Sequence, residues 1–89
     1  MVSKSLKKLN LQVRYDDLAD VLYISFGDPR PGIAVEVNGG DLVRVDPYTN
    51  EVVGITLLDF KERYMPATSM SIEESAQNII PKILNEFNG

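Results

Sequence analysis

The stretch Arg14–Asp28, RYDDLADVLYISFGD, decides how the rest of this chain is arranged. It contains the end of one extended segment, an acidic turn over residues 16–19 (DDLA), and the strand-like run VLYISF. Aspartate suits such a turn because its side chain accepts hydrogen bonds from backbone amides two residues further on. We therefore predict a β-hairpin here, against which the later segments pack.

The register of this hairpin follows from the alternation of apolar and polar residues on both sides of the turn. A period of two is typical of half-buried strands. A four-residue loop sets Val13 opposite Leu22, whereas a five-residue loop sets Val13 opposite Tyr23. We predict the first register, because it keeps Leu22, Ile24 and Phe26 on one buried face and leaves Tyr23 outward.

Three further strands are predicted, over residues 33–37, 42–46 and 52–58. Asn38-Gly39-Gly40 indicates a tight hairpin, because these residues tolerate positive φ. A three-residue loop places Val35 opposite Val43. Gly54 inside the last strand predicts either a close approach by another group or a β-bulge.

The C-terminal segment has the pattern of a helix. Ser71 followed by Glu74 is a capping-box signature. Apolar residues then recur at helical spacing and form one stripe. Pro81 interrupts this pattern and predicts a helix that is kinked or broken there.

The predicted fold class is α+β, a five-stranded antiparallel β-meander with one C-terminal amphipathic helix. The chain of 89 residues is predicted to form a single domain over 1–89. Its parts are a basic leader (1–8), an antiparallel sheet (9–59), a connector (60–70) and a helix (71–88).

Composition narrows the possible functions. The chain contains no cysteine and no histidine, which removes the usual ligands of transition metals and the commonest general base. We therefore expect no enzymatic activity and no cofactor. The net charge of −4 makes nucleic acid an improbable partner, and the basic leader is expected to be a solvated segment. The chain has neither a membrane-length apolar run nor a signal peptide, which predicts a cytoplasmic protein.

Aspartates at the tip of the first hairpin are the most conspicuous chemical feature. Asp16, Asp17 and Asp20 lie close together, and Asp59 follows the last predicted strand. Asp16, Asp20 and Asp59 are weak candidates for a metal site, since hard cations prefer several oxygen ligands. The spacing lacks a calcium-loop pattern. We favour the interpretation that Asp16 caps the turn, Asp20 closes it and Asp17 is solvated.

The face of the sheet away from the helix is the predicted interface. Residues expected on it are Val21, Tyr23, Val52, Thr56 and Leu58. So much apolar area on an open sheet predicts self-association or a protein partner on that face or along an edge strand. We expect a homodimer or a complex with a basic protein.

The order of motifs along residues 13–60 resembles a known family. Residues 15–24 read YDDLADVLYI, followed by Gly39-Gly40, Asp46 and VGITLLD at 53–59. This pattern is similar to that of small prokaryotic proteins grouped as domain of unknown function 2283. The resemblance implies no catalytic residues, and some members resemble the smaller partners of compact toxins.

Together these features predict a small non-enzymatic protein-binding module. It would be either the antitoxin-like partner of a small basic toxin or a self-associating domain. The alternative is a small metal- or ligand-binding protein that uses the carboxylates of the first hairpin.

Overall fold

The computed structural model describes residues 10–37, 39–64 and 71–88. The strands are β1 (Leu11–Asp16), β2 (Val21–Phe26), β3 (Ile33–Val37), β4 (Asp41–Val45) and β5 (Val52–Leu58), and the helices are α2 (Phe60–Tyr64) and α3 (Ile72–Asn88). The predicted leader over residues 1–8 lies outside the described residues. None of the described helices is both long and apolar enough to cross a membrane.

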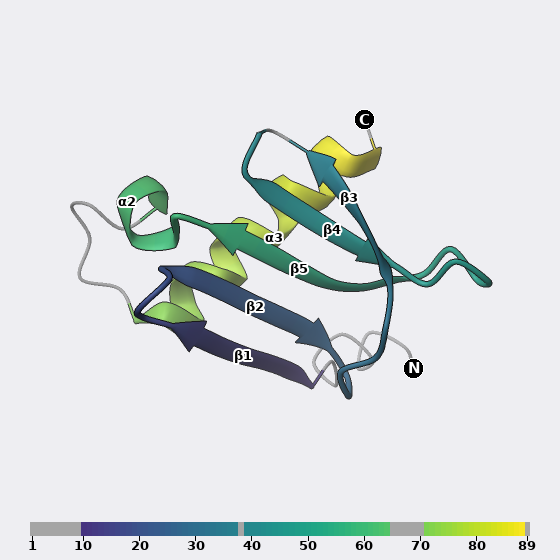
Figure 1. The fold of residues 1–89 in the computed structure, drawn as a ribbon, viewed down its shortest axis with the longest axis horizontal. Coiled ribbons are helices and arrows are strands. Elements are labelled where there is room, and N and C mark those ends of the chain that lie inside the picture. Colours follow the sequence, from purple (N-terminus) through teal and green to yellow (C-terminus); the bar gives the residue numbers. More distant parts are fainter. Residues whose placement is uncertain (1–9, 38, 65–70, 89) are drawn as a thin grey trace.

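All these strands form one antiparallel sheet, and α3 packs on one face of it, which confirms the predicted α+β class (Figure 1). The strand order is β1-β2-β5-β4-β3, and it differs from the consecutive order of a meander because β5 lies between β2 and β4. Burial explains this position. Every residue of β5 from Val53 to Leu57 is buried. A continuous buried run of this kind suits a strand in the middle of a sheet, where neighbouring strands and both faces can be covered.

The connection from β2 to β3 therefore crosses the end of the sheet instead of forming a hairpin (Figure 1). It packs closely on β5. A Cβ atom added at Gly32 would lie 2.9 Å from Cγ2 of Val53, which leaves no room for a larger residue. The glycine in this loop is thus required by the strand beneath it.

The register of β1 and β2 differs from the predicted one by two residues. Val13 pairs with Ile24 rather than Leu22, and the turn occupies residues 17–20. The reason is local: Asp20 adopts φ 58° and ends the turn, so β1 continues through Asp16. A shift of two preserves the side-chain faces, and Leu22 and Ile24 are fully buried as predicted.

The other hairpin has the predicted register, with Val35 opposite Val43 and Ile33 opposite Val45. Both predictions for Gly54 are also confirmed. The β4–β5 ladder has an irregularity between Arg44 and Val45, so that Arg44 pairs with Gly54 and Val45 pairs with Val52. In addition, the Arg44 side chain lies against Gly54.

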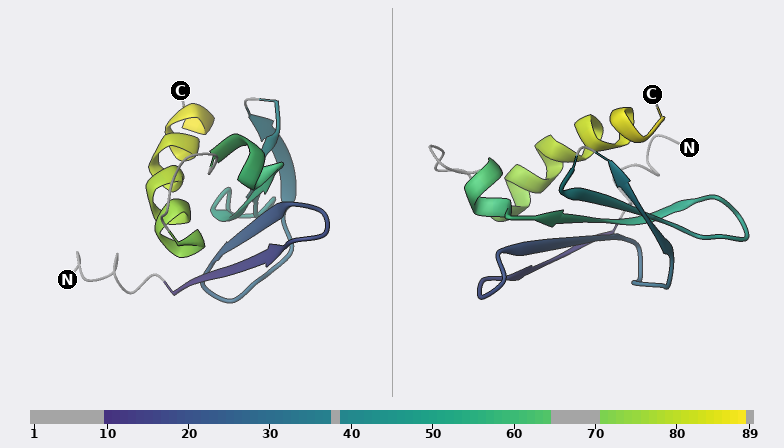
Figure 2. Two further views of the ribbon diagram at one scale, coloured as in Figure 1. Left: turned by 90° about the vertical axis from the view of Figure 1, so that its left-hand side faces the viewer. Right: turned by 45° about the horizontal axis from the view of Figure 1, so that its top comes forward.

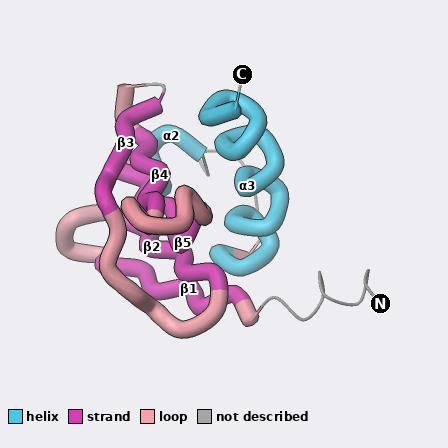
Figure 3. Tube along the Cα trace, turned by 90° about the vertical axis from the view of Figure 1, so that its right-hand side faces the viewer, coloured by secondary structure: helices cyan, strands magenta, loops and turns pink. Residues whose placement is uncertain are grey.

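The core lies between the sheet and α3 (Figures 2 and 3). Its buried residues are Leu22, Ile24, Val43, Ile55, Leu57, Phe60, Ala76, Ile79 and Ile83. The predicted capping box is present, since the Glu74 amide donates to Ser71 Oγ and the Ser71 amide donates to the Glu74 carboxylate, both at 3.1 Å. The helix runs without a break through Pro81, which is exposed.

Helix α2 occupies part of the predicted connector, over Phe60–Tyr64. Phe60 is fully buried and anchors this short helix in the core. Its ring lies between those of Tyr15 and Tyr64, at centroid distances of 6.0 and 5.9 Å. Such tilted aromatic contacts add to the energy gained from burial.

Candidate functional site

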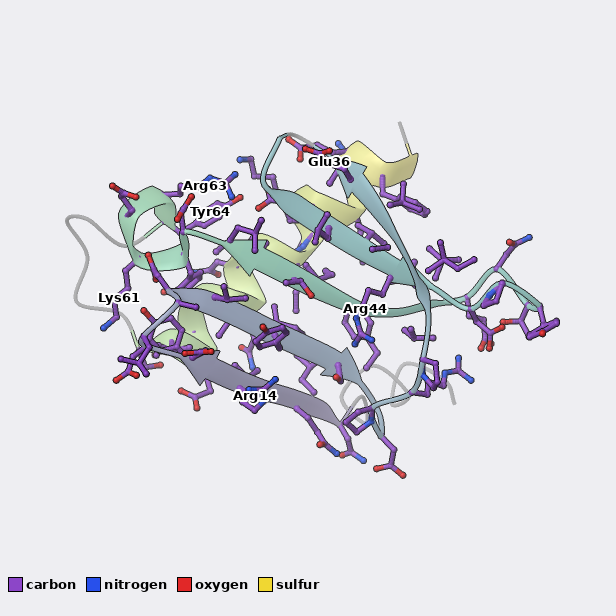
Figure 4. The ribbon with its side chains drawn as sticks, viewed as in Figure 1. Arg14, Glu36, Arg44, Lys61, Arg63 and Tyr64 are labelled. Carbon is purple, nitrogen blue, oxygen red and sulfur yellow. The ribbon has the colours of Figure 1, made fainter. Side chains whose placement is uncertain are left out.

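The sheet face opposite α3, which we call the open face, carries a shallow pocket of about 410 Å³. Figure 4 looks onto this face, with Arg14 on β1 and Arg44 pointing over the middle of the sheet. The side chains that give the pocket its chemistry are those of Gln12, Arg14, Tyr23, Ser25, Arg44 and Thr56.

Arg14 is positioned by its cross-strand neighbour. It pairs with Tyr23 on β2, and its guanidinium carbon lies 4.3 Å from the centroid of the Tyr23 ring. A guanidinium stacked on an aromatic ring keeps its edge N–H groups free to donate. Tyr23 therefore brings a cation from the edge strand to a position above β2.

Arg44 is positioned by the absence of a side chain opposite it. A Cβ atom added at Gly54 would clash with Nη2 of Arg44 and would lie 2.7 Å from the carbonyl oxygen of Ile24. Glycine at 54 thus lets the Arg44 side chain cross from β4 to a position above β5. There its Nη1 donates to the carbonyl oxygen of Arg30 at 3.2 Å, which ties the guanidinium to the β2–β3 loop.

The two guanidinium groups lie on the same face and line the same pocket, with Arg14 coming from β1 and Arg44 from β4, the strands that flank β2 and β5. One lies above Tyr23 on β2 and the other above Gly54 on β5, and β2 and β5 are neighbours. Between them the ladder places Tyr23 opposite Thr56 and Ser25 opposite Gly54. Within the described part of the chain, neither Arg14 nor Arg44 forms an ion pair.

The predicted interface residues are only partly brought together. Val21, Tyr23, Thr56 and Leu58 lie on the open face, where the β2–β5 ladder pairs Val21 with Leu58 and Tyr23 with Thr56. Val52 instead packs against the core beside Val45, because the irregularity at the start of β5 reverses its side.

The open face is also less apolar than predicted. Val21 and Thr56 retain only 9% and 7% of their exposure, whereas Leu58 retains 37%. The most prominent groups of the open face are the Arg14 and Arg44 side chains, which the sequence did not identify as a site.

The aspartates of the first hairpin serve the backbone. Oδ1 of Asp16 accepts from the amides of Leu18 and Ala19 at 3.1 and 3.2 Å, as predicted for a turn cap. Asp17 is exposed. Among the described residues no three acidic, histidine or cysteine side chains are grouped so that they could hold a metal ion.

Asp20 does more than close the turn. Its Oδ1 accepts from the Lys61 amide at 2.8 Å and from the Tyr15 hydroxyl at 2.7 Å, and Oδ2 accepts from the Glu62 amide at 3.4 Å. Asp20 therefore caps α2 across a distance of many residues in sequence. The bond from the Lys61 amide, followed by that from Tyr15, lowers the pKa of Asp20, and the bond to Asp20 raises the pKa of Tyr15 to about 12.

The structure also contains a buried cluster of Asp41, Arg63 and Tyr64 that the sequence did not predict. Asp41 is fully buried, and its carboxylate accepts from Nη1 and Nη2 of Arg63 at 2.7 and 3.2 Å and from the Tyr64 hydroxyl at 2.6 Å. Asp41 raises the pKa of Arg63 through this bond. Burial, and then the bond to Asp41, raises the pKa of Tyr64.

One sequence signal would have revealed this cluster. Asp41 shares the side of β4 that carries Val43 and Val45, so extending that strand by one residue places a carboxylate in the core. Buried carboxylates need a paired cation, and Arg63 is that cation. The cluster joins β4 to α2, so we assign it a structural role.

Comparison with known proteins identifies the family of the chain. No curated protein and no solved structure matches the chain. A family model described as "Protein of unknown function (DUF2283)" matches residues 12–61, which is more than half of the chain and runs from the second residue of β1 to the start of α2. The matched region includes Arg14, Tyr23, Arg44 and Gly54 of the open face. The chain therefore belongs to the DUF2283 family of proteins of unknown function.

Proposed function

We propose that this protein is a small binding module without catalytic activity, which holds an acidic side chain of a protein partner on its open face. The observation that carries the proposal is the convergence of Arg14 and Arg44 above neighbouring strands, with no carboxylate paired to either among the described residues. Guanidinium groups bind carboxylates through two parallel hydrogen bonds. The Ser25 and Thr56 hydroxyls lie between them as additional donors.

The charge of the whole chain favours one carboxylate over a polyanion. The net charge is −4, so a nucleic acid or polyphosphate would meet overall repulsion as it approached. The side chains of Asp16 on β1 and Glu36 on β3 also lie on the open face, at its margins. A single acidic residue can reach the two arginines without bringing further negative charge to those margins.

The surroundings of the pocket favour a protein ligand. Leu58 is exposed and Leu42 is half-buried on the open face, next to Tyr23 and Thr56. Tyrosine and arginine are the residue types that most often dominate the energy of protein interfaces. We therefore expect the bound acidic residue to have apolar neighbours.

Non-catalytic binding is supported by how the perturbed groups are used. Among the described residues, Tyr15, Asp20, Arg63 and Tyr64 have shifted pKa values, and each of these side chains takes part in the hydrogen bonds that hold α2 against the sheet. Perturbed groups at an active site would instead face a cleft. An antitoxin-like role toward a basic toxin stays a prediction, and the two arginines favour an acidic contact on this face.

The proposal can be tested by NMR with ¹⁵N-labelled protein and a blocked Leu-Glu-Leu peptide as probe. We expect chemical-shift changes at Arg14, Tyr23 and Arg44, and weaker binding as salt is raised. Arg44→Gln should weaken binding at least about tenfold, since bonds to charged groups contribute roughly 1.5–3 kcal/mol. Gly54→Ala should have a similar effect by displacing the Arg44 guanidinium.

Controls separate this site from general charge effects. Arg30→Gln removes an exposed arginine that is already paired with Glu51 at 2.6 Å, and it should leave peptide binding unchanged. A Leu-Gln-Leu peptide should not bind. Equal binding of both peptides, or shifts that map away from the open face, would contradict the proposal. Binding of inorganic phosphate without binding of the Glu peptide would also contradict it and indicate a site for small oxyanions.

A further inference from the structure

Strand β3 forms one edge of the sheet, and no strand of the described residues lies on its outer side. Ile33 is 57% exposed and Val35 is 39% exposed. Within the strand, IAVEV, Glu36 is the sole charged residue, and there is no lysine or proline. Proteins usually protect edge strands with such residues or with bulges, so β3 is poorly protected against pairing with another strand.

The hydrogen-bond pattern identifies the backbone groups that point outward from this edge. The Leu58 amide donates to the Gly40 carbonyl oxygen at 3.0 Å, just beyond the pair formed by Asp41 and Leu57. Such a bond outside a pair is typical of a non-hydrogen-bonded pair in an antiparallel ladder. Asp41 therefore turns its amide and carbonyl away from β5 and toward β3.

This alternation continues into β3. Val37 pairs with Asp41 and Val35 pairs with Val43, so both residues direct their backbone groups toward β4. Ala34 and Glu36 then direct theirs away from the sheet. The edge thus offers a regular set of donors and acceptors to an added strand.

An apolar groove accompanies this edge on the side of α3. It has a volume of about 370 Å³ and runs between β3 and the C-terminal end of the helix. Its lining residues are Ile33, Val35, Val45, Pro47, Asn50 and Phe87. A strand added to β3 would place its own inward side chains over this groove and bury Ile33 and Val35.

We propose that the occupant is a second copy of this chain, whose β3 pairs antiparallel with β3 about a two-fold axis at Ala34. In this register Ile33 of each copy lies opposite Val35 of the other, so the apolar residues share one side. The outward backbone groups of Ala34 meet their equivalents directly. Both five-stranded sheets join into one, with both copies of α3 on the same side.

Charge selects this register over its nearest alternative. With the axis at Ala34, Glu36 lies opposite Gly32 of the second copy, and the two Glu36 carboxylates are far apart along the strands. An axis at Val35 would keep the apolar side but would set the two Glu36 residues diagonally adjacent, where like charges repel. The interface is isologous, as in most homodimers.

The oligomeric state tests the proposal directly. Light scattering after gel filtration should show a mass that rises toward twice 9.9 kDa as concentration increases through the micromolar range. Val35→Lys should return the protein to a monomer, whereas Leu58→Lys on the open face should not. A monomeric wild type up to hundreds of micromolar, or a dimer that is unaffected by Val35→Lys, would overturn the proposal.

The register is tested by disulfide trapping, which is clean because the native chain has no cysteine. Hydrogen-bonded antiparallel partners have Cα atoms about 5.5 Å apart, a distance that a disulfide spans. Ala34→Cys should therefore form a covalent dimer on mild oxidation, and Glu36→Cys should not. Efficient trapping through Glu36→Cys, or none through Ala34→Cys in a protein that is otherwise dimeric, would refute this pairing.

Discussion

Asp20 lies where the turn between β1 and β2 ends, and its carboxylate is shared by the Lys61 and Glu62 amides and the Tyr15 hydroxyl. Its backbone contributes as well, since the Asp20 carbonyl oxygen accepts from the Phe60 amide at 3.0 Å. Because Asp20 also adopts φ 58°, this one residue sets the end of the turn and the start of α2.

Asp20→Asn should lower the melting temperature by several degrees, because the amide cannot accept the same bonds as a carboxylate. Asparagine tolerates the positive φ, so the backbone itself is not strained. Asp17→Asn in the same turn removes an exposed charge and should change the melting temperature little. Thermal unfolding followed by circular dichroism measures both; equal effects would contradict the capping role.

The same variant makes a prediction about pH. The lowered folded-state pKa means that Asp20 stabilises the fold above its ordinary pKa of 3.8 and loses this effect as pH falls through the lowered value. Asp20→Asn should therefore reduce the acid dependence of stability. It should also bring the Tyr15 pKa down from about 12 toward 10.0, which ultraviolet titration detects.

At the scale of elements, the short helix α2 is fixed at both of its ends by side-chain hydrogen bonds. Asp20 binds its N-terminus, and Arg63 and Tyr64 at its C-terminus bind Asp41 on β4. The Arg63 side chain also crosses Gly40, where an added Cβ would lie 2.9 Å from Nη1. This short helix therefore depends on tertiary contacts, since isolated helices of this length are unstable.

Asp41→Asn should destabilise the protein by about 3 kcal/mol, because removing one partner leaves the other charge without compensation. Glu62→Gln on the exposed side of α2 is the matched control and should be nearly neutral. Urea unfolding measures both. Combining Asp41→Asn with Arg63→Met should recover part of the loss; full additivity of the two changes would show that the pair is not coupled.

The elements also show where the sequence sufficed. Alternation correctly predicted that the Leu22 and Ile24 side chains are buried, because a buried sheet face imposes a period of two on the strand. The same period cannot distinguish registers that differ by two residues, so the Val13–Leu22 pairing was wrong. Only the conformation of Asp20 decides between them.

Other features depend on contacts that no local pattern contains. The insertion of β5 beside β2 pairs Ile24 with Ile55, residues far apart in sequence. The face of the sheet on which Val52 lies depends on the irregularity in the β4–β5 ladder. Gly54 indicated that a bulge could occur in β5 but not at which residue. The guanidinium pair of the open face required both the strand order and the space above Gly54, and so it emerged only from the structure.

For the whole molecule, the two proposed surfaces lie on different parts of the sheet. The pocket proposed to bind an acidic side chain is formed by β1, β2, β5 and β4 on the open face, whereas the proposed homodimer forms through the edge of β3. We therefore expect them to act independently. Arg14→Gln with Arg44→Gln should abolish peptide binding and leave the dissociation constant of the dimer unchanged.

The converse variant completes this test. Val35→Lys should give a monomer that still binds the Leu-Glu-Leu peptide with wild-type affinity by NMR. A loss of peptide binding in the monomer would show that the pocket needs the second copy. Such a result would contradict the independence of the two surfaces, although each would still bind its own partner in the dimer.

The central position of β5 has a consequence for synthesis on the ribosome. Until residues 52–58 have been translated, β1–β2 and β3–β4 can pair only as separate hairpins, because β5 is the strand that joins them in the sheet. Single hairpins are marginally stable in water, and long-range strand pairing slows folding. The inner edges of β2 and β4 therefore stay unpaired on the nascent chain until β5, the last strand in sequence, is synthesised and pairs with both.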